Sequence, residues 1–223
     1  IFVRYLRNIR HRDVFIIQPH ARPVSDSIME LLIMIDAAKR ASAGRVTAVI
    51  PYYAYGRTDK KDQPRVPITA RLLADLITTA GADRVLTMDL HAGQIQGFFN
   101  IPVDELTALP LLSKYLVSGE TKKQDYVVVA PDEGTVKRAR NLAYELSAPL
   151  AIIEKRRLGN DEKVEARNVI GEVSGKNAIL VDDEIDTGGS MVAATEVLWA
   201  HGIVDVSAMA THPVFSRPRF GGR

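Results

Sequence analysis

Short apolar runs alternate with longer segments of helical periodicity along most of the chain. In the first half, apolar runs bounded by polar or turn-forming residues predict strands at residues 14–18, 46–51 and 84–89. Apolar positions at helical spacing predict helices at residues 25–42 and 67–80, the second ended by Gly81. This alternation predicts parallel strands joined by crossover helices, which is an α/β fold.

The same rhythm returns in the second half. Strands are predicted at residues 126–130, 150–154, 178–181 and 204–211, and helices at residues 133–147 and 189–200. A change of pattern at residues 101–104 indicates a junction between two sheets. We therefore expect two similar domains, residues 1–104 and 105–223, each a mainly parallel sheet flanked by helices.

The predicted helix at residues 27–40 is apolar on nearly all sides. One apolar stripe is enough to cover a sheet. This helix has such a stripe and, elsewhere on its surface, the further apolar residues Met29, Ile33 and Met34. The surplus predicts a subunit interface, and deep burial within one domain is the alternative.

Composition narrows the class of protein. The chain has 223 residues, 46% hydrophobic and 25% charged, as in ordinary globular proteins. A net charge of +2 gives no general attraction to nucleic acid. The absence of cysteine excludes disulfides and thiolate metal sites, and the apolar runs are too short to span a bilayer. We therefore expect a cytoplasmic protein that binds neither nucleic acid nor membranes.

The most informative stretch is residues 179–190, where an apolar run meets Asp182, Asp183 and Glu184 and a glycine-containing turn leads into a helix. Carboxylates accept hydrogen bonds from ribose hydroxyls, and the N–H groups of a helix N-terminus attract phosphate. A ligand-free strand-to-helix turn, capped by Asp186 or Thr187, is the alternative. It leaves the consecutive acids unexplained, so we favour a sugar-phosphate site.

Other predicted strand ends also carry polar chemistry, at residues 52–62, 89–91, 131–135 and 155–157. Taken singly, each has an ordinary structural explanation: a solvated charge run, a structural histidine, a helix cap or a solvated loop. Taken together, these strand ends would lie at the carboxyl edges of parallel sheets, where open α/β proteins bind ligands. Their Arg and Lys side chains suit polyphosphate, and their histidine and carboxylates suit a divalent cation. This inventory indicates phosphoryl or pyrophosphoryl transfer, in a chain without a Walker A motif.

These residues resemble one family, the ribose-phosphate pyrophosphokinases or phosphoribosyl pyrophosphate synthetases, from about residue 1 to residue 216. The strongest blocks are residues 29–36, 55–62, 65–69, 89–99, 155–157 and 182–190. The last block is shared with phosphoribosyltransferases, whereas the Asp-Leu-His-Ala-Gly-Gln-Ile-Gln block that begins at Asp89 is far more specific. The resemblance implies two α/β domains of phosphoribosyltransferase type and a homohexamer built from dimers.

The resemblance also implies a reaction and a set of site residues. ATP and ribose 5-phosphate would give AMP and 5-phosphoribosyl 1-pyrophosphate, for nucleotide biosynthesis, with Mg²⁺ as cofactor. The implied ribose 5-phosphate contacts are Arg157, Asp182, Asp183, Asp186, Thr187, Gly188, Gly189 and Ser190. The implied ATP contacts are Arg57, Thr58 and Asp59, the metal ligands His91 and Asp132, and the catalytic residues Lys155 and Arg157, on a loop that closes over the substrates.

Several positions depart from the family pattern. Thr58 stands where the family has Gln, Gly134-Thr135 where it tends to have two glycines, and Ser190 where Thr is usual. A Phe-Ser-Asp-Gly-Glu segment expected before Ile1, and a strand and helix expected after Ser216, are absent, so we expect either a fragment without its natural ends or a trimmed protein with an incomplete ATP site. A non-catalytic homologue that binds ribose 5-phosphate, and a phosphoribosyltransferase, are the alternatives to an active synthetase.

Overall fold

The structure is a computed structural model that describes residues 1–118, 125–157 and 165–216, without the side chains of residues 155–157 and 165–167. Contacts divide the chain into two compact units, Ile1–Thr107 (unit 1) and Ala108–Arg223 (unit 2). Each has its own sheet and its own core. In the part of the chain that the structure describes, no helix is long and apolar enough to cross a bilayer.

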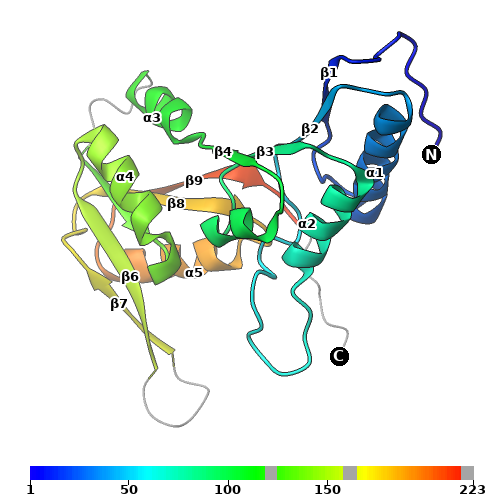
Figure 1. The fold of residues 1–223 in the computed structure, drawn as a ribbon. Helices are drawn as coiled ribbons and strands as arrows, with labels where there is room; N and C mark the ends of the chain where they lie inside the picture. Colours follow the sequence, from blue (N-terminus) through cyan, green and yellow to red (C-terminus); the bar gives the residue numbers. More distant parts are fainter. Residues whose placement is uncertain (119–124, 158–164, 217–223) are drawn as a thin grey trace. The chain divides into compact units, whose positions relative to one another are not determined.

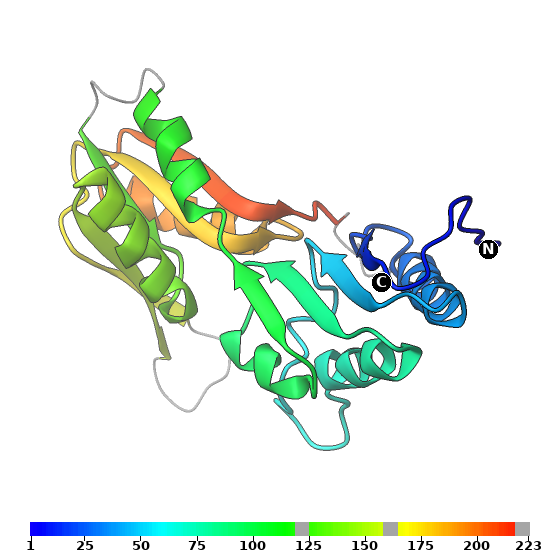
Figure 2. The same ribbon diagram turned by 45° about the horizontal axis from the view of Figure 1, so that its top comes forward.

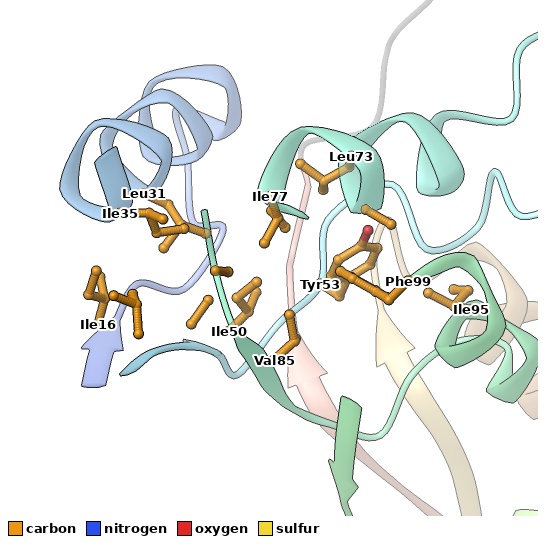
Figure 3. Close-up of a cluster of buried hydrophobic side chains, with 14 of the residues drawn as sticks. Ile16, Leu31, Ile35, Ile50, Tyr53, Leu73, Ile77, Val85, Ile95 and Phe99 are labelled. Carbon is orange, nitrogen blue, oxygen red and sulfur yellow. The ribbon is translucent and has the colours of Figure 1, made fainter. Parts of the chain in front are cut away.

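Unit 1 is a four-stranded parallel sheet in the order β1-β2-β3-β4, which is also the chain order. Its elements are β1 (Asp13–Ile17), α1 (Val24–Arg40), β2 (Arg45–Ile50), α2 (Thr69–Ala80), β3 (Arg84–Met88), the 3₁₀ segment η1 (Gly93–Phe98) and β4 (Val103–Leu106). Figure 3 shows its core, where Leu31 and Ile35 of α1 and Ile77 of α2 pack toward the buried strand residues.

Unit 2 is a five-stranded sheet in the order β7-β6-β5-β8-β9, parallel except for the antiparallel pair β6-β7. Its elements are α3 (Leu109–Ser118), β5 (Tyr126–Ala130), the 3₁₀ segment η3 (Glu133–Thr135), α4 (Val136–Leu146), β6 (Leu150–Arg157), β7 (Glu165–Ile170), β8 (Asn177–Ile185), α5 (Gly189–Ala200) and β9 (Asp205–Pro213). One core cluster includes α4 and the other α5. In Figure 2 the yellow-green α4 and the orange α5 accordingly lie on opposite faces.

The α/β class with two sheets, each flanked by helices, is confirmed, but three local predictions are wrong. The predicted junction at residues 101–104 runs into β4, which pairs with β3. Asp104 and Glu105 hide this short strand from a hydrophobicity pattern. The domain bounds expected on this junction, residues 1–104 and 105–223, stay a prediction, and the division into compact units falls three residues later, after Thr107.

The second error concerns the segment after residue 154, which was expected to be a solvated loop as far as Arg167. The described part of it is a hairpin instead, because β6 continues to Arg157 and pairs with β7 from Glu165 onward. Figure 1 shows the two strands as a ribbon at the edge of the sheet.

The third error concerns β8, which was expected to end at Val181. It continues through Asp182, Asp183 and Glu184 to Ile185 because β9 pairs with it along this whole length. Helix α3, which no pattern had predicted, precedes β5. In α1, only Leu31, Ile35 and Ala38 are buried, and Met29 is 51% exposed. The subunit interface expected on this helix stays a prediction.

Candidate functional site

An acidic cluster lies in unit 2 where β5 and β8 run side by side. Val129 pairs with Leu180, so Asp132, just beyond the end of β5, comes close to the acidic part of β8. The negative charge of Asp132 acts on Asp182, as does that of Asp183. The tertiary structure therefore brings Asp132 close to the adjacent pair Asp182 and Asp183, although Asp132 and Asp182 are fifty residues apart in sequence (132 to 182).

Asp182 is the most perturbed carboxylate of this cluster. Burial, followed by its hydrogen bond with Asp183 and the charges of Asp183 and Asp132, raises the pKa of Asp182 to about 7. The side chain of Asp183 is itself buried, at 5% exposure. A carboxyl group whose pKa lies near 7 can gain or lose a proton when a cation or a hydroxyl group binds beside it.

The glycine turn (residues 186–190) joins β8 to α5. Gly188 has φ +79, in the left-handed region, and α5 begins at Gly189. A Cβ at Gly188 would meet no atom within 4 Å, and Thr187, Gly189 and Ser190 are exposed. The start of α5 is therefore open to a ligand, and its backbone N–H groups can bind an anion there.

Asp132 is held by the short η3 segment that follows β5. Its Oδ1 accepts the backbone N–H of Thr135 at 3.1 Å, and the Thr135 hydroxyl donates to the carbonyl of Asp132 at 3.0 Å. A Cβ at Gly134 would lie 3.3 Å from Asp132 Oδ1. Asp132 is thus a cap, as its structural explanation required, and it also faces the acidic strand.

Lys155 and Arg157 belong to β6 rather than to a loop. Their backbones pair with Arg167 and Glu165 of β7. The expected closing loop is therefore wrong for these two residues, and their side chains lie outside the description. Their assignment to catalysis stays a prediction.

Unit 1 carries the other candidate residues. Arg57 is exposed in the loop between β2 and α2, where the N–H of Thr58 bonds to the carbonyl of Tyr55 at 2.9 Å. Asp59 is buried at 8% exposure and accepts a hydrogen bond from Gln94 Nε2 at 2.6 Å. Asp59 therefore anchors this loop to η1, while Arg57 faces solvent.

His91 lies in the His91 turn (residues 89–92), between β3 and η1, and is exposed. A Cβ at Gly56 would lie 3.4 Å from Cβ of His91, so the loop of Arg57 packs directly against this turn. The structure thereby brings Arg57 and His91 into one neighbourhood within unit 1. Gln94 and Glu105, for which the sequence predicted no role, make hydrogen bonds to these two loops. Gln94 donates to Asp59 in the loop of Arg57, and Glu105 accepts the N–H of Leu90 in the His91 turn.

The predicted metal is Mg²⁺, with His91 and Asp132 as its protein ligands. Among the described residues, no three His, Cys, Asp or Glu side chains are grouped as a metal cluster. Mg²⁺ needs few protein ligands, because it keeps several waters and shares substrate phosphates. The oxygen donors around Asp132 and Asp182 fit that chemistry. His91 belongs to unit 1 and Asp132 to unit 2, so their pairing stays a prediction.

A mainly parallel sheet with acidic residues on an inner strand, followed by an open glycine turn at a helix start, defines a domain of the phosphoribosyltransferase class. The family model of the phosphoribosyl transferase domain accordingly matches residues 111–214. The model of the N-terminal domain of ribose phosphate pyrophosphokinase matches residues 1–81. The chain belongs to the ribose-phosphate pyrophosphokinase family.

Individual relatives of the chain support its membership of this family. The chain is 60% identical over 210 residues to a ribose-phosphate pyrophosphokinase of Clostridium acetobutylicum, covering 94% of this chain and 66% of the relative. It is 57% identical to one of Caldanaerobacter subterraneus, covering 98% and 68%. A crystal structure of phosphoribosylpyrophosphate synthetase from Mycobacterium smegmatis matches with a TM-score of 0.89 at 48% identity, covering 97% of this chain and 70% of that one. The chain thus spans about two thirds of the length of these relatives, and the resemblance predicted from the motifs is confirmed.

Proposed function

We propose that the protein transfers the pyrophosphoryl group of ATP to the 1-hydroxyl of ribose 5-phosphate, giving 5-phosphoribosyl 1-pyrophosphate and AMP for nucleotide biosynthesis. The single observation that carries this proposal is the 57% identity to a ribose-phosphate pyrophosphokinase over 98% of the chain. The acidic strand and open glycine turn of unit 2 support it, because together they suit a phosphorylated ribose.

The acceptor would bind in unit 2. The N–H groups at the start of α5, with the hydroxyls of Thr187 and Ser190, would hold the 5-phosphate, with Asp186, Gly188 and Gly189 shaping the turn. Asp182 and Asp183 would accept hydrogen bonds from the ribose hydroxyls. Orienting the sugar this way fixes the direction in which its 1-hydroxyl attacks the β-phosphorus of ATP.

Donor binding is assigned to Arg57 and Thr58, with Asp59 supporting their loop through Gln94. Lys155 and Arg157 would neutralise the negative charge that develops on the transferring group. Mg²⁺, held by His91 and Asp132 together with the substrate phosphates, would supply further charge neutralisation. In this proposal units 1 and 2 are two domains, and the protein is a cytoplasmic homohexamer of dimers.

The test is release of AMP from ATP in the presence of Mg²⁺, with and without ribose 5-phosphate. The proposal requires AMP and 5-phosphoribosyl 1-pyrophosphate in equal amounts, and only when ribose 5-phosphate is present. Binding of ribose 5-phosphate without any AMP would contradict it and would favour a non-catalytic homologue.

A further inference from the structure

The turn that carries His91 is tied to the neighbouring strand β4 at its first residue. Asp89 has φ +41, in the left-handed region, which is unusual for a residue other than glycine. Its N–H donates to the carbonyl of Leu106 at 2.9 Å, and its Oδ1 accepts from the hydroxyl of Thr107 at 2.9 Å. The direction in which the chain leaves β3 is therefore set by β4.

Glu105 on the same strand makes a second connection, and its carboxylate is shared between two donors. Oε1 accepts the backbone N–H of Leu90 at 3.0 Å, and Oε2 accepts Nε2 of Gln96 at 2.5 Å. Leu90 is the residue immediately before His91, and Gln96 lies in η1, which follows the turn. One side chain thus bridges the two ends of the segment that presents His91.

We propose that Glu105 is a positioning residue for His91. The two hydrogen bonds of Glu105 hold the segment on both sides of His91, and the side chain of Leu90 is anchored in the core at 5% exposure. With Leu90 fixed at both its side chain and its N–H, the backbone that leads to the exposed His91 ring has little freedom. Glu105 itself touches neither substrate nor metal in this role.

The same arrangement couples His91 to the loop of Arg57. Gln94, between the turn and Gln96, donates to Asp59 at 2.6 Å. The 3₁₀ segment η1 is therefore hydrogen-bonded on one side to β4, through Gln96 and Glu105, and on the other to the loop that carries Arg57, through Gln94. Since His91 is assigned to the metal and Arg57 to ATP, this inference rests on the proposed function. A positioning role of Glu105 predicts that its substitution weakens the binding of Mg²⁺ and ATP and leaves the binding of ribose 5-phosphate unchanged.

The kinetic test compares two substitutions of Glu105 with a control on the same strand. Glu105→Ala removes both acceptors, and we expect the Mg²⁺ concentration for half-maximal activity to rise roughly tenfold, with KM for ribose 5-phosphate unchanged. Glu105→Gln keeps one acceptor for Leu90, and its amide can donate to a flipped Gln96, so near-normal Mg²⁺ dependence is expected. Asp104→Asn, which loses the same charge beside Arg84, serves as the control.

Two outcomes would overturn the inference. If Glu105→Gln is impaired as strongly as Glu105→Ala, the charge of Glu105 acts directly and not through the turn. If Glu105→Ala keeps the wild-type Mg²⁺ dependence, Glu105 does not position His91. If Glu105→Ala raises the KM for ribose 5-phosphate as strongly as it raises the Mg²⁺ requirement, the role of Glu105 is merely structural.

Hydrogen exchange of the ligand-free protein separates this inference from the proposed function. In Glu105→Ala, peptides that span residues 84–98 should exchange faster than in the wild type, with peptides of unit 2 unchanged. Glu105→Gln should retain protection. This measurement needs no turnover, so an inactive wild type would refute the proposed function alone, and unchanged exchange in Glu105→Ala would refute the positioning role alone.

Discussion

The backbone N–H of Asp183 donates a hydrogen bond to Oδ1 of Asp182 at 2.8 Å, yet the carboxyl group of Asp182 keeps its proton up to about pH 7. That bond favours the ionised form, so on its own it would lower the pKa. Burial and the adjacent carboxylates outweigh it. Ionised Asp182 is thus destabilised by burial and by repulsion from the adjacent carboxylates, and a bound cation or a set of hydroxyl donors would stabilise it.

The first prediction concerns stability and pH. The pKa of Asp182 is raised on folding from 3.8 to about 7, so the folded state binds this proton more tightly than the unfolded state. The stabilisation is complete below the unfolded pKa and is lost as the pH rises through about 7. We expect the Tm of ligand-free protein to fall between about pH 5 and about pH 8, and to fall less in Asp182→Asn. Equal slopes in the two proteins would contradict this assignment.

The second prediction concerns ligand binding over the same range. Only ionised Asp182 accepts hydrogen bonds through both oxygens, so affinity for ribose 5-phosphate should rise as the pH passes through about 7. The sugar phosphate also titrates, near pH 6. Calorimetric titration of Asp182→Asn isolates that contribution, because only the phosphate titrates there. The wild type should show the steeper pH dependence.

A third prediction tests the glycine turn. Asp186→Ala should weaken binding of ribose 5-phosphate roughly tenfold or more, because the hydrogen-bonding side chain that shapes the turn around the anion site is lost. Asp205→Ala removes an exposed carboxylate of the same unit, at the start of β9, and should leave affinity unchanged. Unaltered binding in Asp186→Ala would argue against a phosphate site at the start of α5.

A fourth prediction tests catalysis. Lys155→Ala should lower kcat roughly 10²-fold or more, since it removes charge neutralisation of the transferring group. The melting temperature should hardly change, because Lys155→Ala leaves the backbone pairing of β6 with β7 in place. Lys114→Ala, on exposed α3, is the matched control. Near-normal turnover in Lys155→Ala would remove it from the catalytic residues.

The fifth prediction compares two glycines with positive φ. Gly81 ends α2 at φ +108, and a Cβ there would lie 2.7 Å from Cγ of Lys39, whose ammonium group bonds to Asp83 at 3.1 Å. Gly175 has φ +73 and open space around it. Gly175→Ala should cost roughly 1 kcal/mol of backbone strain, and Gly81→Ala roughly 2–3 kcal/mol because Lys39 must also move. Denaturant unfolding of both variants measures the difference.

Sequence patterns worked best where local signals agreed with the tertiary environment. Strand β5 and helix α5 were predicted with their observed bounds, because an apolar run and a glycine turn before an apolar segment are strong local signals. Patterns failed where pairing with a distant strand overrode them. Asp182 and Glu184 belong to β8 because Ala210 and His212 of β9 pair with them, and acidic residues do not predict a strand.

The amino-acid sequence by itself determined the α/β class, the family and the inventory of candidate residues, since these depend on residue types and short spacings. The tertiary structure alone decided the environment of those residues. Asp182 has its pKa near 7 because folding buries it and brings Asp132 close, and the turn before His91 is held by Glu105 of another strand. Solvation and long-range hydrogen bonds are set by groups that are distant along the chain, and no local pattern encodes them.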